Sequence, residues 1–420
     1  MADQISGTAD ETAEESFWNV ADDSMNDPEE MRVIFCALDS YLQYRKVSHF
    51  NVTHMRRQTF YALPQRQWQM LAGPPFNYLE TLDKVDECIK ANADFAETIA
   101  QIGLQSMQLG ETGPDQEIAL PREWTGCAKH QDVDKARSTL RQFYRDWSEE
   151  GAEERAACYN PVKNALKKER AKRQERGVEG RMKILVPGAG LARLMFDLCV
   201  DGFDVEGNEI SYHQLLASSY VLNFCEHVGQ HTIYPWVHGF SNHKTRSNHL
   251  RGYKIPDIHC ATVMGQAPEV GTMSMTAADF ICDYSNEEKL GTFDAVASCF
   301  FLDTAPNLIR YLQTIHGCLK PGGLLVNIGP LLWHFENTPP GQHHHEDDDG
   351  DQGNSNNRGN GIADPGSFEL TDDEVMALVE KMGFVVESRT TGIHAPYIQD
   401  PESMLQTTYR ASSWVARKPT

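Results

Sequence analysis

The segment 184-ILVPGAG-190 decides the fold of this 420-residue chain. Its apolar residues 184–186 predict a short buried strand, and a helical pattern follows over residues 191–200. Between them, Gly188 and Gly190 let the backbone approach a ligand closely where the strand gives way to the helix. The segment therefore predicts the first strand, turn and helix of a ligand-binding α/β sheet.

Strand and helix patterns alternate beyond this segment, which predicts a parallel sheet with helices on both faces. The expected helices lie at 211–221, opened by Ser211 as N-cap, and at 307–319. The expected strands lie at 203–207, 293–298 and 324–328, the last entered through a turn at 320–323, and then at 384–388 and 408–416. The last two predict an antiparallel edge on the Rossmann-like α/β fold.

Three other regions are expected around this domain, which we place at 131–420. Residues 1–27 are acidic with no Lys or Arg and predict a disordered tail. Residues 28–130 show apolar spacings of three and four and predict a helical N-terminal region. Residues 338–367 predict a disordered insertion; its His343–His345 triplet is interpreted as low-complexity sequence, so no metal site is predicted.

Charge and composition exclude several classes of function. The net charge of −22 argues against nucleic acid as the main partner, and the Lys/Arg-rich residues 163–176 are interpreted as a solvated helix face. No apolar run is long enough to span a membrane, and no secretion signal is recognised. The ten cysteines are scattered singly, which indicates reduced thiols. We expect a cytoplasmic protein, with the nucleus as a further location.

The acidic residue Glu209 narrows the choice of ligand. It stands 21 residues after Gly188, at the end of the next predicted strand, where a carboxylate accepts from both hydroxyls of a ribose. Arg193 occupies the place of the third glycine of a dinucleotide fingerprint, and no P-loop is present. Asp279-Phe280 precedes the strand at 293–298, an arrangement typical of adenine contacts in class I methyltransferases. This order favours S-adenosylmethionine.

Three longer motifs carry a closer resemblance. They are 142-QFYRDWS-148, 299-CFFLDT-304 and 329-GPLLWHFEN-337. With them the chain resembles the carnosine N-methyltransferase family over roughly residues 30–420, apart from the insertion. The family transfers a methyl group from S-adenosylmethionine to a ring nitrogen of the histidine in β-alanyl-histidine. By this resemblance, the cofactor contacts would be Gln142, Arg145, Gly188, Glu209, Asp279, Phe280 and Cys299, and the substrate contacts Asp303, His334, Tyr397 and Tyr409.

The chemistry explains these residue types. Neutral imidazole has one N–H and one bare nitrogen, and only the bare nitrogen can attack a methyl group. Asp303 would accept the N–H, fix the tautomer and stabilise the developing imidazolium, while His334 and the tyrosines would fix the ring plane. No metal is needed. Taken singly, each residue also has a structural interpretation: Asp303 as a cap for the helix near Asn307, His334 as a core histidine, the tyrosines and Cys299 as packing residues.

One departure from the family leaves the substrate open. The family has a run of tyrosines before the last strand, whereas this chain reads 406-QTTY-409 and places Thr407 where an aromatic substrate contact is expected. The first hypothesis is a methyltransferase acting on a histidine-containing dipeptide. The second is methylation of histidine within peptides or proteins, and the third is an inactive binding scaffold, against which the intact cofactor set argues. The oligomeric state stays open, with a homodimer as one expectation.

Overall fold

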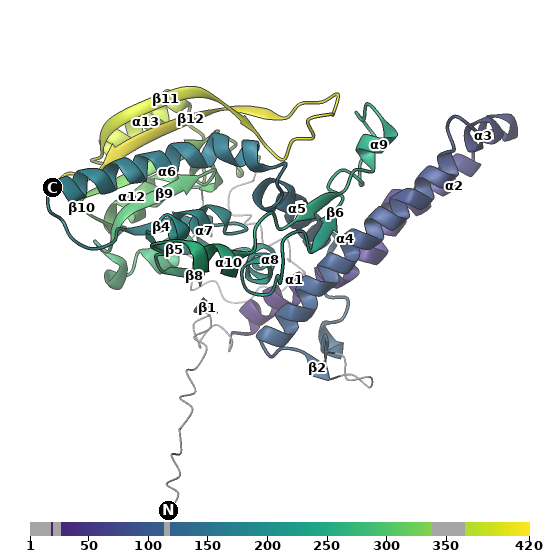
Figure 1. The fold of residues 1–420 in the computed structure, drawn as a ribbon, viewed down its shortest axis with the longest axis horizontal. Helices are drawn as coiled ribbons and strands as arrows, with labels where there is room; N and C mark the ends of the chain where they lie inside the picture. Colours follow the sequence, from purple (N-terminus) through teal and green to yellow (C-terminus); the bar gives the residue numbers. More distant parts are fainter. Residues whose placement is uncertain (1–17, 20–26, 113–117, 338–365) are drawn as a thin grey trace, which may run out of the picture.

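The computed structural model describes residues 18–19, 27–112, 118–337 and 366–420 (Figure 1). The expected acidic tail and insertion lie almost entirely outside these residues. The main sheet has the strand order β1-β8-β5-β4-β9-β10-β12-β11. In that order the strands are Trp18–Asn19, Met273–Ala277, Asp204–Glu209, Lys183–Pro187, Phe293–Cys299, Leu319–Gly329, Thr408–Arg417 and Val385–Pro396.

The pairing within the sheet confirms the predicted α/β class with an antiparallel edge. Strands β1, β8, β5, β4, β9 and β10 pair in parallel, β12 runs antiparallel to β10, and β11 runs antiparallel to β12. The predicted turn at 320–323 lies inside β10, where the register with β9 shifts between Leu319 and Leu324. Two small antiparallel pairs stand apart from the sheet: β2 (Glu111–Thr112) with β3 (Ile118–Ala119), and β6 (His231–Ile233) with β7 (Tyr253–Ile255).

Helices cover both faces of the sheet, because the central strands are apolar on both sides. Along β4, Ile184 and Val186 belong to one buried cluster and Leu185 to the other. The first face is covered by α6 (Ala152–Glu175), α7 (Arg193–Val200), α8 (Tyr212–Asn223) and α10 (Cys260–Gln266). The second is covered by α11 (Phe280–Tyr284), α12 (Leu308–Cys318) and α13 (Asp372–Lys381).

The N-terminal helices form a long hairpin beside the first face (Figure 1). Its elements are α1 (Pro28–Ser48), the π-helical turn His49–His54, α2 (Met55–Tyr61), α3 (Gln65–Ala72) and α4 (Tyr78–Ser106). Helices α1 and α4 pack on each other and on α5 (His130–Trp147) and α8, with the Phe95 ring 4.9 Å from that of Phe143. Helices α2 and α3 lie at the end of the hairpin farthest from the sheet (Figure 1).

The remaining short elements are the 3-10 turns Arg122–Trp124, Glu287–Lys289 and Leu302–Thr304 and the helix α9 (Arg246–His249). Within the described ranges, no helix is both long and apolar enough to cross a membrane.

Candidate active site

The fold gathers the candidate residues at one edge of the sheet. Parallel strands end at the same edge, so residues that follow β4, β5, β8 and β9 lie along one line of strand ends. Glu209 is the last residue of β5 and Cys299 the last of β9. Because β12 is antiparallel, its second residue, Tyr409, lies at this edge as well, opposite Ala395 near the end of β11.

Glu209 joins the glycine turn to the end of β5. Its Oε2 atom accepts a hydrogen bond from the backbone N–H of Gly190 at 2.9 Å, and Oε1 accepts from the N–H groups of Ile210 and Ser211, both at 2.9 Å. Ser211 is the N-cap residue of α8, as predicted, although its side chain makes no capping hydrogen bond. Burial raises the pKa of Glu209, and the three N–H donors oppose that rise.

The glycine turn lets a ligand approach the backbone closely. Gly188 has a φ of +63°, and a Cβ atom there would lie 2.7 Å from Cδ2 of Phe301. Oε2 of Glu209 accepts only one of the hydrogen bonds above, and a carboxylate oxygen can accept two. The turn and the carboxylate therefore fit a ligand that presents hydroxyl groups to Glu209, as the ribose of S-adenosylmethionine does.

Asp279 and Phe280 follow β8 and begin α11. Oδ1 of Asp279 caps that helix by accepting from the N–H groups of Ile281 at 2.8 Å and Cys282 at 3.0 Å. The Phe280 ring is buried in the second core cluster, with its centroid 5.3 Å from that of Phe301. Phe280 is thus a core residue, while the adjacent Asp279 is half-buried.

An ion pair on α5 positions Arg145. The guanidinium binds the Asp146 carboxylate through two hydrogen bonds of 2.8 and 2.9 Å, and the Tyr159 hydroxyl donates to Asp146 at 3.1 Å. Burial alone lowers the pKa of Arg145, but the adjacent Asp146 carboxylate raises it well above its ordinary value. Sequence reasoning missed Asp146 and Tyr159, although Asp146 lies inside the 142–148 motif on the buried side of its helix.

The Arg145 guanidinium also faces the predicted substrate residues, because it lies 5.3 Å from the ring centroid of Tyr397. Gln142 lies one turn earlier on the same helix and is half-buried.

Asp303 lies in the short turn after β9 and is buried, with 4% of its surface exposed. Oδ2 accepts from the backbone N–H of Leu332 at 2.9 Å, and the Asp303 carbonyl accepts from the N–H of His334 at 3.2 Å. Burial raises the pKa of Asp303, opposed by the Leu332 N–H and by the nearby His334.

The structure decides against two of the structural alternatives. The side chain of Asn307 caps α12 by accepting from the N–H of Arg310, so Asp303 is not the cap of that helix. The His334 side chain is exposed, so it is not a core histidine. A buried carboxylate with one oxygen bonded to Leu332 is instead available to a polar ligand beside His334.

Three aromatic rings form a cluster at the same edge of the sheet, which we call the aromatic cage: Phe300, Tyr397 and Tyr409. Phe300 stacks on Tyr397 at 5.5 Å and meets the edge of Tyr409 at 5.9 Å, and the two tyrosine rings are 5.8 Å apart. Burial raises the pKa of Tyr409, and the charges of Tyr397 and Asp303 add to the effect. Sequence reasoning missed Phe300, although it lies inside the 299–304 motif.

The cage suits a ligand that becomes cationic. Aromatic faces attract cations, and a carboxylate beside them adds to that attraction. Tyr397 thus lies beside both Tyr409 and Arg145, and the charge of Asp303 acts on Tyr409. At the ends of β4 and β5 the residue that bonds Glu209 is Gly190, two residues after Gly188. The described residues hold no group of His, Cys, Asp and Glu arranged for a metal, and the His343–His345 triplet lies outside them.

Comparison with known proteins gives consistent matches. A family model described as carnosine N-methyltransferase matches residues 122–420. Proteins named carnosine N-methyltransferase from Mus musculus and Schizosaccharomyces pombe are each 34% identical, over 91% and 93% of this chain and 85% and 97% of their own lengths. One from Drosophila melanogaster is 37% identical over 68% of this chain and 55% of its own.

Solved structures are more distant. A methyltransferase from Methanosarcina mazei, 15% identical, covers 57% of this chain and 94% of its own with a TM-score of 0.34. A magnesium protoporphyrin IX methyltransferase from Synechocystis, 11% identical, covers 69% and 95% with a TM-score of 0.34.

Proposed function

The chain belongs to the carnosine N-methyltransferase family, and from this premise we propose that it methylates an imidazole nitrogen of a small histidine-containing dipeptide such as carnosine. The methyl donor in this proposal is S-adenosylmethionine. The observation that supports it most strongly is the buried Asp303 carboxylate, whose charge acts on Tyr409 of the aromatic cage, because a carboxylate and aromatic rings suit a ring which is neutral before the reaction and cationic after it.

The cofactor half of the proposed site lies at the ends of β4, β5 and β8. Glu209 would accept the ribose hydroxyls, Asp279 would lie at the adenine, and the glycine turn would let both come close. Bound S-adenosylmethionine supplies an electrophilic methyl group on a sulfonium sulfur. Arg145, fixed by Asp146, would lie between this half and the cage.

The substrate half consists of Asp303, His334 and the cage. Asp303 would accept the imidazole N–H and so leave the other ring nitrogen bare for attack. The bond from Leu332 holds the carboxylate in place before substrate arrives, so little reorganisation is needed as positive charge develops. Tyr397 and Tyr409 would hold the ring plane in line with the methyl group.

A radiolabelled methyl-donor assay tests the proposal. Carnosine, free histidine, histidine-containing peptides and denatured whole-cell protein would be offered in parallel, with the Asp303→Asn variant as the matched control. We expect label in the dipeptide that depends on Asp303. Label confined to protein would favour the second hypothesis, and no label in any acceptor would favour the inactive scaffold.

A further inference from the structure

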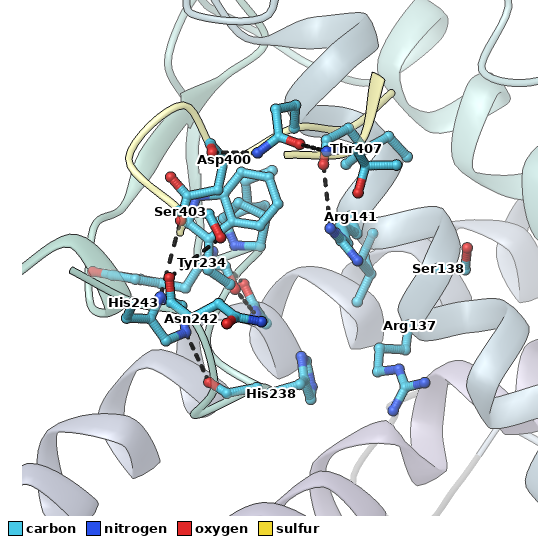
Figure 2. Close-up of a pocket in the computed structure, with 18 of the residues that line it drawn as sticks. Arg137, Ser138, Arg141, Tyr234, His238, Asn242, His243, Asp400, Ser403 and Thr407 are labelled. Atoms are coloured by element: carbon cyan, nitrogen blue, oxygen red, sulfur yellow. Dashed lines mark hydrogen bonds and ion pairs between the residues drawn. The ribbon is translucent and has the colours of Figure 1, made fainter. Parts of the chain in front are cut away.

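A cavity of about 470 Å³ lies beside the aromatic cage and is not part of the proposed catalytic site. Its walls come from α5, from the segment after β6 and from the loop between β11 and β12 (Figure 2). Figure 2 shows Arg137, Ser138 and Arg141 along one side and His238, Asn242 and His243 on the other.

Arg141 is a preorganised cation in this cavity. Its guanidinium lies 5.0 Å from the ring centroid of Trp236, and Nη2 donates to the Ile398 carbonyl at 3.2 Å. Among the residues that the structure describes, no carboxylate forms an ion pair with Arg141. Its neighbour Arg137, by contrast, pairs with Asp134 at 3.1 Å.

The carboxylates whose charges act on Arg141, those of Asp400 and Glu154, already accept hydrogen bonds from other groups. Asp400 accepts from the Asn248 side chain at 2.8 Å and from the Glu402 N–H at 2.9 Å. Glu154 accepts from the backbone N–H groups of Ile398 and Gln399. A guanidinium has five N–H donors in a planar fork, so Arg141 keeps donors for a ligand.

The cavity and the cage share the loop between β11 and β12. The Tyr397 N–H donates to the Thr407 carbonyl at 3.2 Å, so the cage residue Tyr397 and the cavity residue Thr407 are bonded neighbours. Gln399 closes the same loop by accepting from the Thr407 N–H and donating to the Leu405 carbonyl at 3.2 Å. Ile398, next to Tyr397, both lines the cavity and binds Arg141.

We propose that this cavity binds the free carboxylate of the methyl acceptor, with Arg141 as its anchor; the inference rests on the proposed function. Two reasons support this: the carboxylate is close to the imidazole ring in the substrate, and its charge is opposite to that of Arg141. In a dipeptide that ends in histidine, the carboxylate is only a few bonds from the imidazole ring, so a ring held in the cage places the carboxylate near the shared loop. A planar guanidinium that has no carboxylate partner is the side chain best matched to it.

The proposal defines a class of substrate. Acceptors whose histidine is C-terminal carry the required carboxylate, whereas a histidine inside a protein chain carries an amide at that position. The enzyme would therefore select free peptides that end in histidine and reject internal protein histidines. This selection would act on substrate binding, because Arg141 would contact the carboxylate and not the reacting nitrogen.

The experiment is a double-mutant cycle in which one change removes the Arg141 guanidinium and the other removes the carboxylate of the substrate. Binding of carnosine and of its C-terminal amide is measured by calorimetry on wild type and Arg141→Met, each loaded with S-adenosylhomocysteine, alongside initial rates with S-adenosylmethionine. We expect amidation to weaken binding to wild type about 10- to 100-fold, the range for a charge-assisted hydrogen bond. Arg141→Met should bind carnosine as weakly as wild type binds the amide, and should not distinguish the two.

Controls separate this role from a general loss of structure. Lys135→Met removes a cation from the same helix but outside the cavity, and should leave both affinities unchanged. The affinity for S-adenosylhomocysteine should also be unchanged in Arg141→Met. If that variant does not fold, Arg141→Lys replaces it, because it keeps the charge and loses the fork; a smaller loss in the same direction is then expected.

Each remaining outcome has a definite meaning. Wild-type turnover of carnosine with equal affinity for the amide would overturn the carboxylate site and leave the proposed function standing. Discrimination that persists in Arg141→Met would assign the carboxylate to another residue and overturn the role of Arg141. Neither binding nor turnover of either dipeptide by wild type would overturn the proposed function and this inference together.

Discussion

The carboxylate of Asp303 accepts a hydrogen bond from the backbone N–H of Leu332 at 2.9 Å, and this bond ties the segment after β9 to the segment after β10. The tie also orders His334, whose N–H donates to the Asp303 carbonyl at 3.2 Å. Two motifs separated by a helix and a strand are thus joined around one buried acid, and that acid is the natural place to test the mechanism.

Asp303→Asn should reduce turnover by roughly two to four orders of magnitude, the range for loss of a preorganised electrostatic or acid–base group. The amide oxygen can still accept from Leu332, but it cannot offset the positive charge that develops on the ring. Steady-state rates would be measured beside calorimetry with S-adenosylmethionine, whose affinity should survive. Turnover near that of wild type would remove Asp303 from the mechanism.

The same substitution predicts a pH effect on stability. Burial raises the pKa of Asp303 in the folded protein, so the folded state takes up a proton at higher pH than the unfolded chain. Wild type therefore gains stability from this group as the pH falls, and Asp303→Asn does not. As the pH is lowered through the raised pKa of Asp303 toward its ordinary value, the melting temperature of the variant should therefore fall relative to that of wild type. A difference that is constant with pH would contradict this.

Glu209→Ala should weaken S-adenosylmethionine about 10-fold or more, since each hydrogen bond to a charged group contributes about 1.5–3 kcal/mol. Calorimetry on the variant measures the loss. Glu206→Gln is the matched control, because Glu206 is a buried acid on the same strand that pairs with Lys289 at the opposite end from the ligand turn. Equal affinities in wild type and Glu209→Ala would exclude Glu209 from the site.

Asp146→Ala should destabilise the fold by about 3–5 kcal/mol, because it leaves the Arg145 guanidinium half-buried and without its ion pair. Chemical denaturation gives the free energy of unfolding. Tyr159→Phe removes one hydrogen bond to the same carboxylate and should cost only about 1 kcal/mol. Similar decreases in the free energy of unfolding in the two variants would show that the ion pair contributes no more to stability than the single hydrogen bond from Tyr159.

Gly188→Ala should impair both stability and cofactor affinity. A Cβ atom at this φ of +63° would be strained and would collide with Phe301 at 2.7 Å. Gly126→Ala is a control with strain alone, since Gly126 has a φ of +84° and nothing within 4 Å of its Cβ position. We expect about 1–2 kcal/mol for the control and a larger loss for Gly188→Ala. Thermal melting and calorimetry would separate the two effects.

The sequence by itself determined the α/β class and every strand of the main sheet except β1 and β8, and it predicted where a ligand would bind. Apolar runs of strand length, glycines at 188 and 190 and an acid at the next strand end are local patterns, and parallel strands necessarily align their carboxyl ends. The longer motifs further determined the family. Each of these features can be recognised within a few neighbouring residues, because backbone preference and side-chain periodicity are set locally.

Only the tertiary structure decided which polar groups meet. That Asn307 and not Asp303 caps α12, that Glu209 takes the N–H of Ser211, and that Asp146 fixes Arg145 all depend on distances of about 3 Å between atoms whose separation no local pattern sets. The cavity at Arg141 is the clearest case. Its walls come from α5, the segment after β6 and the loop before β12, and only their packing shows that Arg141 forms no ion pair with a carboxylate of the described residues.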